Sequence, residues 1–424
     1  MNILLIVVLP ALLLLMGVPI FVVLLAAALG GIVLSGNPIQ ALHSAMFGNL
    51  DIFPLLAVPL FIYAGDIMSR GGIARRLIEL IMSLVGAVRG ALGIATIAAC
   101  EVFSVMSGSS VACVAAIGKI TIPSLKKNGY GDTFSVSLVT ATGVIDVITP
   151  PSIAMIIYGI VAQQSVPHLF LAGFPAGILI GIALAIYVVV YAKIKKIPIT
   201  RPAERKNILV HLKDSIWSLL APVVILGGIY GGLFTPTEAA GVACIYAIVI
   251  SMFVYREITW RELWEITVES SALIAQILII VSAAGAFAWL VTTSGFPGKL
   301  VAFVQDLGLT KWILLLVINI ILLFIGSVLE PPAAILLLTP LLTPIVYQAG
   351  VDPIHFGIIV TVNLAIGMFM PPFGLNLFAS HALFGTPLPA LYRGVLPFLA
   401  IYLVMLIVIT YVPEITLAPV RLLR

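Results

Sequence analysis

Two short polar stretches, Ser107-Gly108-Ser109-Ser110 and Thr149-Pro150-Pro151-Ser152, interrupt an otherwise apolar segment, and Asp146 adds a carboxylate close to the second. Glycine, paired prolines and hydroxyl side chains break helices and leave backbone groups without intrahelical partners. At membrane depth such sequence is unfavourable unless it lines a cavity enclosed by protein. We therefore expect the functional site within residues 104–152, and we interpret the rest of the chain around this stretch.

The composition is that of a membrane protein. Of the 424 residues, 62% are hydrophobic and 9% are charged, whereas soluble domains carry about 25% charged residues. Apolar segments long enough to span a bilayer recur along the whole chain, and no polar segment is long enough for a soluble domain. The three cysteines lie in apolar context, which favours buried thiols over disulfides. We predict an all-α polytopic protein in a lipid bilayer, with no nucleic-acid partner.

The first part of the chain, residues 1–192, has a recognisable order. We predict one long span over residues 1–34, retained because no positive region precedes it, and an interfacial amphipathic helix over residues 73–88. Residues 88–125 are predicted to form a re-entrant hairpin, because basic residues flank both ends of its apolar part, residues 90–125: Arg89 before it, and Lys126 and Lys127 after it. Pro150-Pro151 splits residues 129–162 into two half-helices. Residues 167–192 form a clean span.

The middle part, residues 193–269, begins with the most basic stretch of the chain. By the positive-inside rule this loop is cytoplasmic; its basic residues are Lys193, Lys195, Lys196, Arg201, Arg205, Lys206 and Lys213, against Glu204 and Asp214. A helix pair at residues 216–233 and 239–255 follows. We expect a second interfacial helix over residues 256–269, because Trp260 and Trp264 are spaced for an aromatic belt.

The last part, residues 270–424, repeats the first. It contains a second predicted hairpin, residues 310–347, broken at 326–332, and a second broken helix, residues 353–383, divided at Pro371-Pro372. The offset between the two double prolines, 371 minus 150, is 221 residues, and the same offset pairs Gly129 with Gly350 and Thr140 with Thr361. Internal repeats with broken helices are typical of secondary transporters.

The two repeats should be inverted. Five predicted spans separate Lys126-Lys127 from the second hairpin, and an odd number places that hairpin on the opposite side of the membrane. The charges there give mixed support, because the prediction makes these four basic residues non-cytoplasmic: Lys299, Lys311, Arg421 and Arg424.

The chemistry of broken helices indicates what the site binds. Carbonyl and hydroxyl oxygens at a break suit a hard cation such as Na⁺, whereas helix N-termini suit a substrate carboxylate. Each repeat provides a hairpin tip and a broken helix. We therefore expect two cation sites, with an anionic substrate between the tips.

Three motifs resemble one known family, the large membrane subunit of tripartite ATP-independent periplasmic (TRAP) transporters. They are Met106-Ser107-Gly108-Ser109-Ser110-Val111-Ala112, Thr149-Pro150-Pro151-Ser152-Ile153 and Gly227-Gly228-Ile229-Tyr230-Gly231-Gly232-Leu233-Phe234-Thr235-Pro236-Thr237-Glu238-Ala239-Ala240. The resemblance covers nearly the whole chain. It implies a sodium-driven elevator in the inner membrane, a small four-helix membrane subunit, and a periplasmic binding protein that delivers an organic acid such as a C4-dicarboxylate or sialic acid.

The resemblance also implies site residues. The first sodium site matches Ser107, Ser109, Asp146, Thr149 and Pro151, and the second matches Gly326, Gly367, Met370 and Pro372. The internal offset relates Asp146 to Gly367, so the two sites are symmetry mates. Asp146 is a departure, because glycine is usual there in the family; a carboxylate would strengthen cation binding or bind a proton.

Further polar residues near the breaks are candidates for substrate contact. They are Ser110, Thr142, Glu330 and Asn363. Glu330 would repel an anionic substrate unless it is paired or protonated. We expect Asp66 and Glu101 to anchor helices at the membrane interface.

Other functions remain open from the residues alone. A stand-alone sodium- or proton-coupled organic-anion carrier would have a related architecture, and purified-chain activity would identify it. An intramembrane enzyme is disfavoured, because the sequence lacks a Gly-x-Ser-x-Gly motif with a histidine partner and a paired His/Glu metal motif. We accordingly expect no catalytic residues and no cofactor beyond the coupling ion. A channel fits the repeated hairpins less well than alternating access.

Overall fold

The computed structural model describes residues 4–36, 38–84, 88–199 and 205–422, and every regular element in these ranges is helical. Eight of the described helices are long and apolar enough to cross a membrane, or nine if the bent pair Ile208–Asp214 and Ile216–Tyr230 counts as one span. This confirms the predicted all-α polytopic fold. Residues 1–3 of the first predicted span, residues 85–87 of the predicted amphipathic helix, and the single positions Arg201, Glu204 and Arg424 lie outside the described residues.

The first part of the chain ends with a long apolar helix after the broken one. Its elements are η1 (Leu4–Val8), α1 (Leu9–Leu15), α2 (Ile20–Ser35), α3 (Gln40–Gly48), η2 (Phe53–Leu56), α4 (Ala57–Arg70), α5 (Ile73–Ser83), α6 (Ala91–Ser107), α7 (Ser110–Lys127), α8 (Asp132–Thr142), α9 (Ile145–Ile148), α10 (Ile153–Val161) and α11 (Val166–Ile194).

The remaining elements begin in the basic stretch and end near the C-terminus. They are α12 (Arg205–Asp214), α13 (Ile216–Tyr230), α14 (Pro236–Val249), η3 (Ile250–Val254), α15 (Trp260–Thr293), α16 (Phe296–Asp306), α17 (Lys311–Val328), α18 (Pro331–Gln348), α19 (Pro353–Gly367), α20 (Leu375–Phe384), α21 (Leu388–Tyr411) and α22 (Glu414–Leu422).

The internal repeat holds at the level of single residues. Helices α7 and α18 are both 18 residues long, and their first residues, Ser110 and Pro331, differ by 331 minus 110, or 221. The same offset separates the starts of α8 and α19, at Asp132 and Pro353. Both double prolines contain a cis peptide bond. The two predicted hairpins and the two predicted broken helices are therefore present in matching register.

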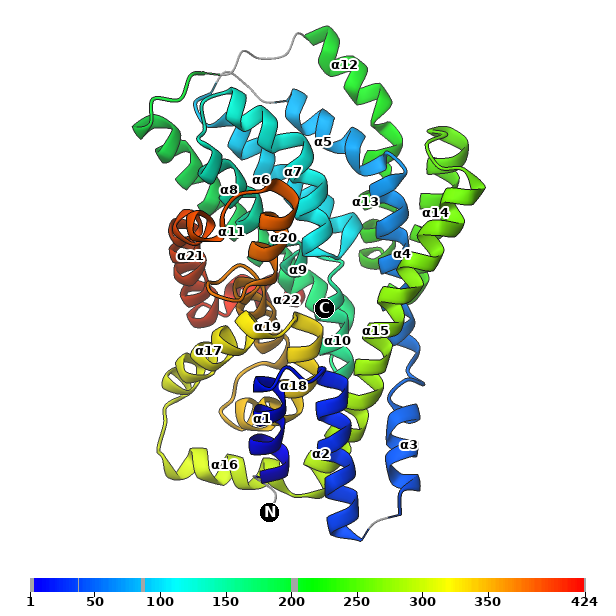
Figure 1. The fold of residues 1–424 in the computed structure, drawn as a ribbon, viewed down its shortest axis with the longest axis vertical. Helices are drawn as coiled ribbons and strands as arrows, with labels where there is room; N and C mark the ends of the chain where they lie inside the picture. The colour runs from blue at the N-terminus through cyan, green and yellow to red at the C-terminus, as the bar shows by residue number, and fades with distance from the viewer. Residues whose placement is uncertain (1–3, 37, 85–87, 200–204, 423–424) are drawn as a thin grey trace.

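The two hairpins enter the molecule from opposite ends. In Figure 1, α6 and α7 lie in the upper part with α5 and α8, whereas α17 and α18 lie in the lower part with α16. The tips of both hairpins nevertheless line one cavity, described below. This arrangement confirms the inverted repeats. The arms differ between the halves, because α6 packs along α7 while α17 packs mainly along α19.

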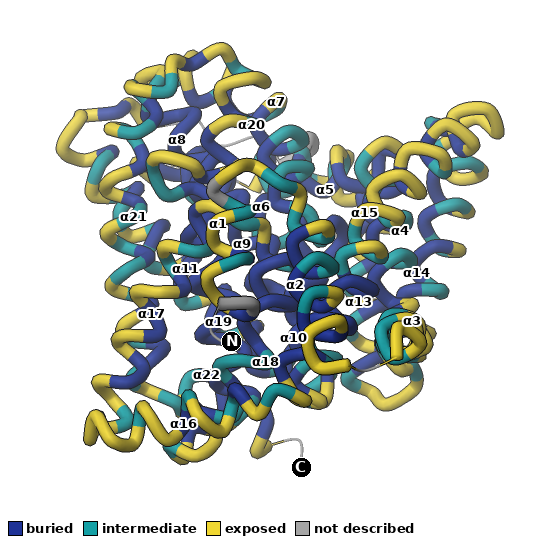
Figure 2. The backbone as a smooth tube through the Cα atoms, turned by 60° about the horizontal axis from the view of Figure 1, so that its bottom comes forward, coloured by how far each residue is buried: buried dark blue, intermediate teal, exposed yellow. Residues whose placement is uncertain are grey.

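The broken helices form the centre of the protein. Nearly every residue of α8, α9, α10 and α19 is buried, and Figure 2 shows α9, α10 and α19 toward the middle with exposed helices such as α16 at the rim. The long surrounding helices alternate buried and exposed apolar faces, as expected for helices that contact lipid on one side. Polar backbone at the breaks is thereby enclosed by protein, which is the condition for irregular structure at membrane depth.

The prediction of one span over residues 1–34 is wrong. The chain turns between Met16 and Pro19, so that α1 and α2 are separate helices. Gly17 takes a left-handed φ of 77°, and Pro19, at the N-cap of α2, has no N–H group to continue the first helix. Neither helix reaches the length of the eight candidate spans.

A separate interfacial helix over residues 256–269 is also not found. This segment is the first part of α15, a single helix of 34 residues that is about 51 Å long. Thr259 and Glu262 form a capping box that starts the helix, and no proline or glycine interrupts it near Glu269. The two tryptophans are exposed, at 70% each, but they belong to this long helix.

The predicted amphipathic helix near residues 73–88 is present as α5. Ile73, Leu77 and Ile78 face inward, and Arg75 forms an ion pair with Glu257 at 2.6 Å. The stretch read as a basic loop after α11 contains a helix, α12, which the charge pattern did not reveal. After α15, helix α16 begins at a glycine of positive φ, Gly295, as α5 does at Gly72.

Candidate functional site

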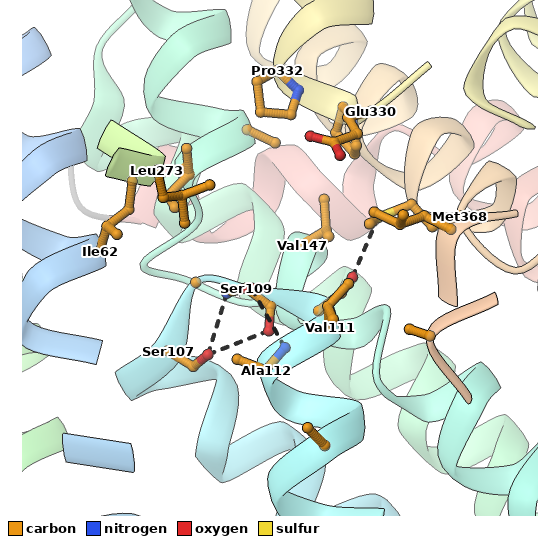
Figure 3. Close-up of a pocket in the computed structure, with 18 of the residues that line it drawn as sticks. Ile62, Ser107, Ser109, Val111, Ala112, Val147, Leu273, Glu330, Pro332 and Met368 are labelled. Carbon is orange, nitrogen blue, oxygen red and sulfur yellow. Dashed lines mark hydrogen bonds between the residues drawn. The ribbon is translucent and has the colours of Figure 1, made fainter. Parts of the chain in front are cut away.

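A cavity of about 560 Å³ lies where the two hairpin tips meet. Figure 3 shows Ser107, Ser109 and Val111 of the first tip on one side, and Glu330 and Pro332 of the second tip on the other. The remaining walls come from α4, α9, the start of α10, α15, the C-cap of α19, and α20; they include Ile62, Asp66, Val147, Ser152, Ile153, Leu273, Ile277, Met368, Leu375 and Ala379. Segments more than two hundred residues apart thus share one chamber.

The first tip is a glycine turn followed by a capped helix. Gly108 takes a left-handed φ of 63°, which ends α6. The Ser109 N–H group donates to Ser107 Oγ at 3.3 Å, and Ser109 Oγ accepts from the Ala112 N–H group at 3.5 Å. The N–H groups of Ser110 and Val111, in the first turn of α7, have no intrahelical acceptor. The tip therefore presents hydroxyls and free backbone donors to the cavity.

The second tip has a different chemistry. Leu329 is extended, and Glu330 occupies the N-cap position of α18 without capping it by its side chain. Pro331 and Pro332 follow, and neither has an N–H group. Glu330 is exposed to the cavity and takes part in none of the ion pairs between described residues. This tip presents a carboxylate and few donors.

The first tip packs against the first break. The Asp146 side chain is completely buried in α9, and neither carboxylate oxygen has a hydrogen-bond partner among the described residues. The Gly108 N–H group faces this carboxylate without reaching hydrogen-bond geometry. A Cβ at Gly108 would lie 3.9 Å from the Pro151 carbonyl oxygen. The structure therefore brings Ser107, Asp146 and Pro151 into one neighbourhood.

Thr149 forms a hydrogen bond with Glu101, a carboxylate that was predicted to lie at the membrane interface. Its Oγ1 donates to Glu101 Oε2 at 3.0 Å, while Glu101 Oε1 has no partner among the described residues. The prediction that Glu101 anchors a helix at the interface is wrong, because this residue lies within α6, against glycines of α11. A Cβ at Gly181 would lie 2.5 Å from Glu101 Oε1. The absence of side chains on that helix face makes room for the carboxylate.

Asp66 is likewise not an interfacial anchor. It lies on α4, lines the cavity, and accepts a hydrogen bond from Ser270 Oγ of α15 at 2.6 Å. One turn further along the same pair of helices, Arg70 forms an ion pair with Glu269. The position of Asp66 along its span does not reveal which helix face meets a neighbour, so the prediction from sequence was wrong.

The second break is held by two glycines. A Cβ at Gly367 would lie 2.2 Å from the carbonyl carbon of Gly326, so the backbones of α17 and α19 are in direct contact there. The Met370 carbonyl accepts from the Gly374 N–H group at 3.0 Å, and the Pro372 carbonyl accepts from Tyr392 Oη at 2.9 Å. A carbonyl oxygen has two lone pairs, so both retain capacity for a cation.

The four residues predicted for substrate contact divide into two pairs. Ser110 and Glu330 line the cavity, whereas Thr142 and Asn363 do not. Thr142 Oγ1 donates to the Leu138 carbonyl at 2.8 Å. Asn363 Nδ2 donates to Asn319 Oδ1 at 2.8 Å, and its Oδ1 has no partner among the described residues. Both side chains lie one turn before a break, inside the packed centre.

Asn376 is a site residue that the sequence interpretation missed. Ser110 Oγ donates to Asn376 Oδ1 at 3.0 Å, which connects the first tip to α20, beyond the second break. Thr140 and Ser380 make a second such contact, with 2.6 Å between their hydroxyl oxygens. An amide within an apolar helix was the available signal. These contacts tie the two repeats into one unit around the cavity.

Inverted repeats, broken helices and a chamber at the meeting of two hairpin tips define a multi-pass membrane transporter rather than an enzyme. Comparison with known proteins gives the family. The chain matches the family described as "Tripartite ATP-independent periplasmic transporter, DctM component" over residues 6–415. It belongs to this family of transporter permeases, and the resemblance drawn from the three motifs is confirmed.

Several relatives are similar to this protein along almost its whole chain. It is 42% identical over 394 residues to the C4-dicarboxylate TRAP transporter large permease protein of Pseudomonas aeruginosa, covering 93% of this chain and 92% of that one. It is 36% identical over 402 residues to the sialic acid TRAP transporter large permease protein of Vibrio cholerae, covering 95% and 94%. The isethionate TRAP transporter permease protein of Oleidesulfovibrio alaskensis is 42% identical over 407 residues, covering 96% of this chain and 64% of that longer protein.

A solved structure shares the fold at low sequence identity. The YdaH transporter of Alcanivorax borkumensis, described as having an unusual topology, has a TM-score of 0.67 and 14% identity, with 88% of each chain covered.

Proposed function

We propose that this protein is the large permease subunit of a sodium-coupled importer of an organic acid in the bacterial inner membrane. The observation that carries the proposal is the chamber between the two hairpin tips, with a broken helix behind each tip. The named substrates of the relatives, C4-dicarboxylates, sialic acid and isethionate, are all organic acids. These substrates differ from one another, so similarity to the relatives does not identify the substrate of this protein.

The first cation site is supported by unpartnered acceptors. Asp146 has two buried oxygens without partners, and Glu101 has one. Buried carboxylates are unfavourable unless a cation or hydrogen-bond donors compensate them. A sodium ion held by Asp146, the Ser107 hydroxyl and carbonyls near Pro151 would supply that compensation. The second site would bind its cation without a carboxylate. Its ligands would be backbone carbonyls around Gly326 and Gly367 and those of Met370 and Pro372.

The mechanism follows from the inverted arrangement. In the proposed elevator, the hairpins and broken helices move together as one body against the long helices, which is supported by the Ser110–Asn376 and Thr140–Ser380 contacts between the repeats. Sodium at the breaks would fix the tips and so prepare the Ser110 and Val111 donors for the substrate acid group. A small membrane subunit would support the long helices, and a periplasmic binding protein would deliver the substrate.

Uptake into proteoliposomes tests this function. The chain is purified with a small membrane subunit and reconstituted, and a labelled organic acid is supplied on a periplasmic binding protein. We expect uptake only with an inward sodium gradient and with all three components present. Uptake that persists without sodium would overturn the coupling and indicate protons instead. Uptake by the large chain alone would favour the stand-alone carrier.

A further inference from the structure

The ionisable side chains that line the cavity are all acidic. Among the described lining residues these are Asp66 and Glu330, and no lysine, arginine or histidine accompanies them. Asp66 accepts from Ser270, whereas the Glu330 carboxylate faces the chamber from the second tip without a cationic partner in the described part of the chain. A substrate with two negative ends would therefore meet a like charge on at least one side.

The two tips are unequal as partners for an acid group. The first tip offers the free N–H groups of Ser110 and Val111, the positive end of an 18-residue helix, and serine hydroxyls. At the second tip, prolines occupy the first two positions of α18 and remove two of its four free donors. Glu330 adds a negative charge to the same end. The acid group of a substrate is thus favoured at the first tip and disfavoured at the second.

We propose that the substrate is a monovalent acid whose far end carries hydrogen-bond donors, ammonium or hydroxyl, and that Glu330 selects it against dicarboxylates. In this arrangement the acid group lies at the Ser110 and Val111 N–H groups, and the donor end lies at the Glu330 carboxylate. The inference rests on the proposed function, because it takes the cavity between the tips as the substrate site.

Four acids of equal chain length distinguish a site that selects a donor-bearing monovalent acid from a site that selects a dicarboxylate. The complex of the chain with its small subunit is placed in nanodiscs at saturating sodium, without the binding protein, so that only the membrane site selects. Binding of γ-aminobutyrate, γ-hydroxybutyrate, butyrate and succinate is measured by calorimetry and by thermal shift. We expect the two donor-bearing acids to bind more tightly than butyrate, and succinate to bind most weakly.

Variants of Glu330 test whether this residue is responsible for the order in which the four acids bind. Glu330→Gln exchanges a charged acceptor for an amide that also donates, so we expect γ-aminobutyrate to lose about 10- to 100-fold in affinity and succinate to gain relative to it. Glu330→Asp keeps the charge and should keep the order of the four acids. Glu265→Gln, at an exposed position of α15, is the matched control and should change nothing.

The outcomes are separable from those of the transport assay. Three results would overturn the proposal that Glu330 selects the substrate. They are tighter binding of succinate than of the other acids by the unaltered protein, an unchanged order of affinities in Glu330→Gln, and no binding of any of the four acids. None of these results alters sodium-dependent uptake of the natural substrate, which tests the proposed function. If Glu330→Gln fails to fold, Glu330→Asp and the four-acid order in the unaltered protein still decide the proposal.

Discussion

At the scale of single residues, Asp146 is the feature that departs most from the repeat. Its symmetry mate is Gly367, which leaves no side chain in the second site. Both Asp146 oxygens are buried without partners among the described residues, close to the glycine that ends α6. An unpaired buried carboxylate is strongly unfavourable, and this is the physical reason for the cation that we propose at Asp146.

Replacement of Asp146 by asparagine keeps the shape and removes the charge. We expect the sodium concentration for half-maximal uptake to rise by about tenfold or more, equal to about 1.4 kcal/mol, because a carboxylate binds Na⁺ more strongly than an amide does. Sodium titration of uptake in proteoliposomes measures this. Asp132→Asn, at an exposed position, is the control. An unchanged sodium dependence would mean that hydroxyls and broken backbone carry the site.

At the scale of helices, the second site depends on a close crossing rather than on side chains. Helices α17 and α19 touch through Gly326 and Gly367. The sequence predicted both glycines as site residues from the resemblance, and it predicted the breaks from the double prolines. It did not predict that α17 would pack mainly along α19 rather than along α18, because both arms are uniformly apolar and their faces look alike.

Substitution of Gly367 by alanine should force this crossing apart. The added methyl group would lie 2.2 Å from the Gly326 carbonyl carbon, and overpacking of this kind destabilises by about 1–3 kcal/mol. We expect a lower unfolding temperature in detergent and a smaller stabilisation by sodium. Gly298→Ala, on α16 with no atom within 4 Å of the added Cβ, should leave both unchanged. Equal behaviour of the two variants would contradict the close crossing.

At the scale of the whole molecule, the two halves oppose each other across the cavity. The open ends of the hairpins lie at opposite ends of the protein, with α5 in the upper part of Figure 1 and α16 in the lower part. The exposed residue Lys127 ends α7, and the exposed residue Lys299 belongs to α16. The basic stretch around α12 lies at the same end as α5, and by the positive-inside rule we expect that end to face the cytoplasm.

Accessibility labelling tests this orientation in cells. We expect Lys299→Cys to react with a membrane-impermeant maleimide from outside, and Lys127→Cys to react only after the membrane is opened. The three native cysteines are buried and should give little background. Labelling of both positions from the same side would contradict an inverted pair of hairpins spanning the membrane.

The local breaks and the repeat can be predicted from the order of the amino acids without a structure. Proline lacks an N–H group and glycine tolerates positive φ, so Ser107–Ser110 and the two double prolines mark interruptions wherever they occur in an apolar chain. The repetition of these interruptions at one offset is then visible in the amino-acid sequence without a structure. Even so, the turn at Met16–Pro19 was passed over, because the run of apolar residues around it outweighed a single glycine and a single proline.

Which residues come into contact depends on how the helices pack in the folded protein. The apposition of Glu330 with the first tip, the bond from Thr149 to Glu101, and the place of Asp66 in the cavity wall join segments that are far apart in the chain. Such neighbours depend on which face each helix turns to the others, and an apolar helix in lipid carries little pattern that marks one face as inner. Packing and the enclosure of polar groups settle that choice, and they turn two local breaks into one site.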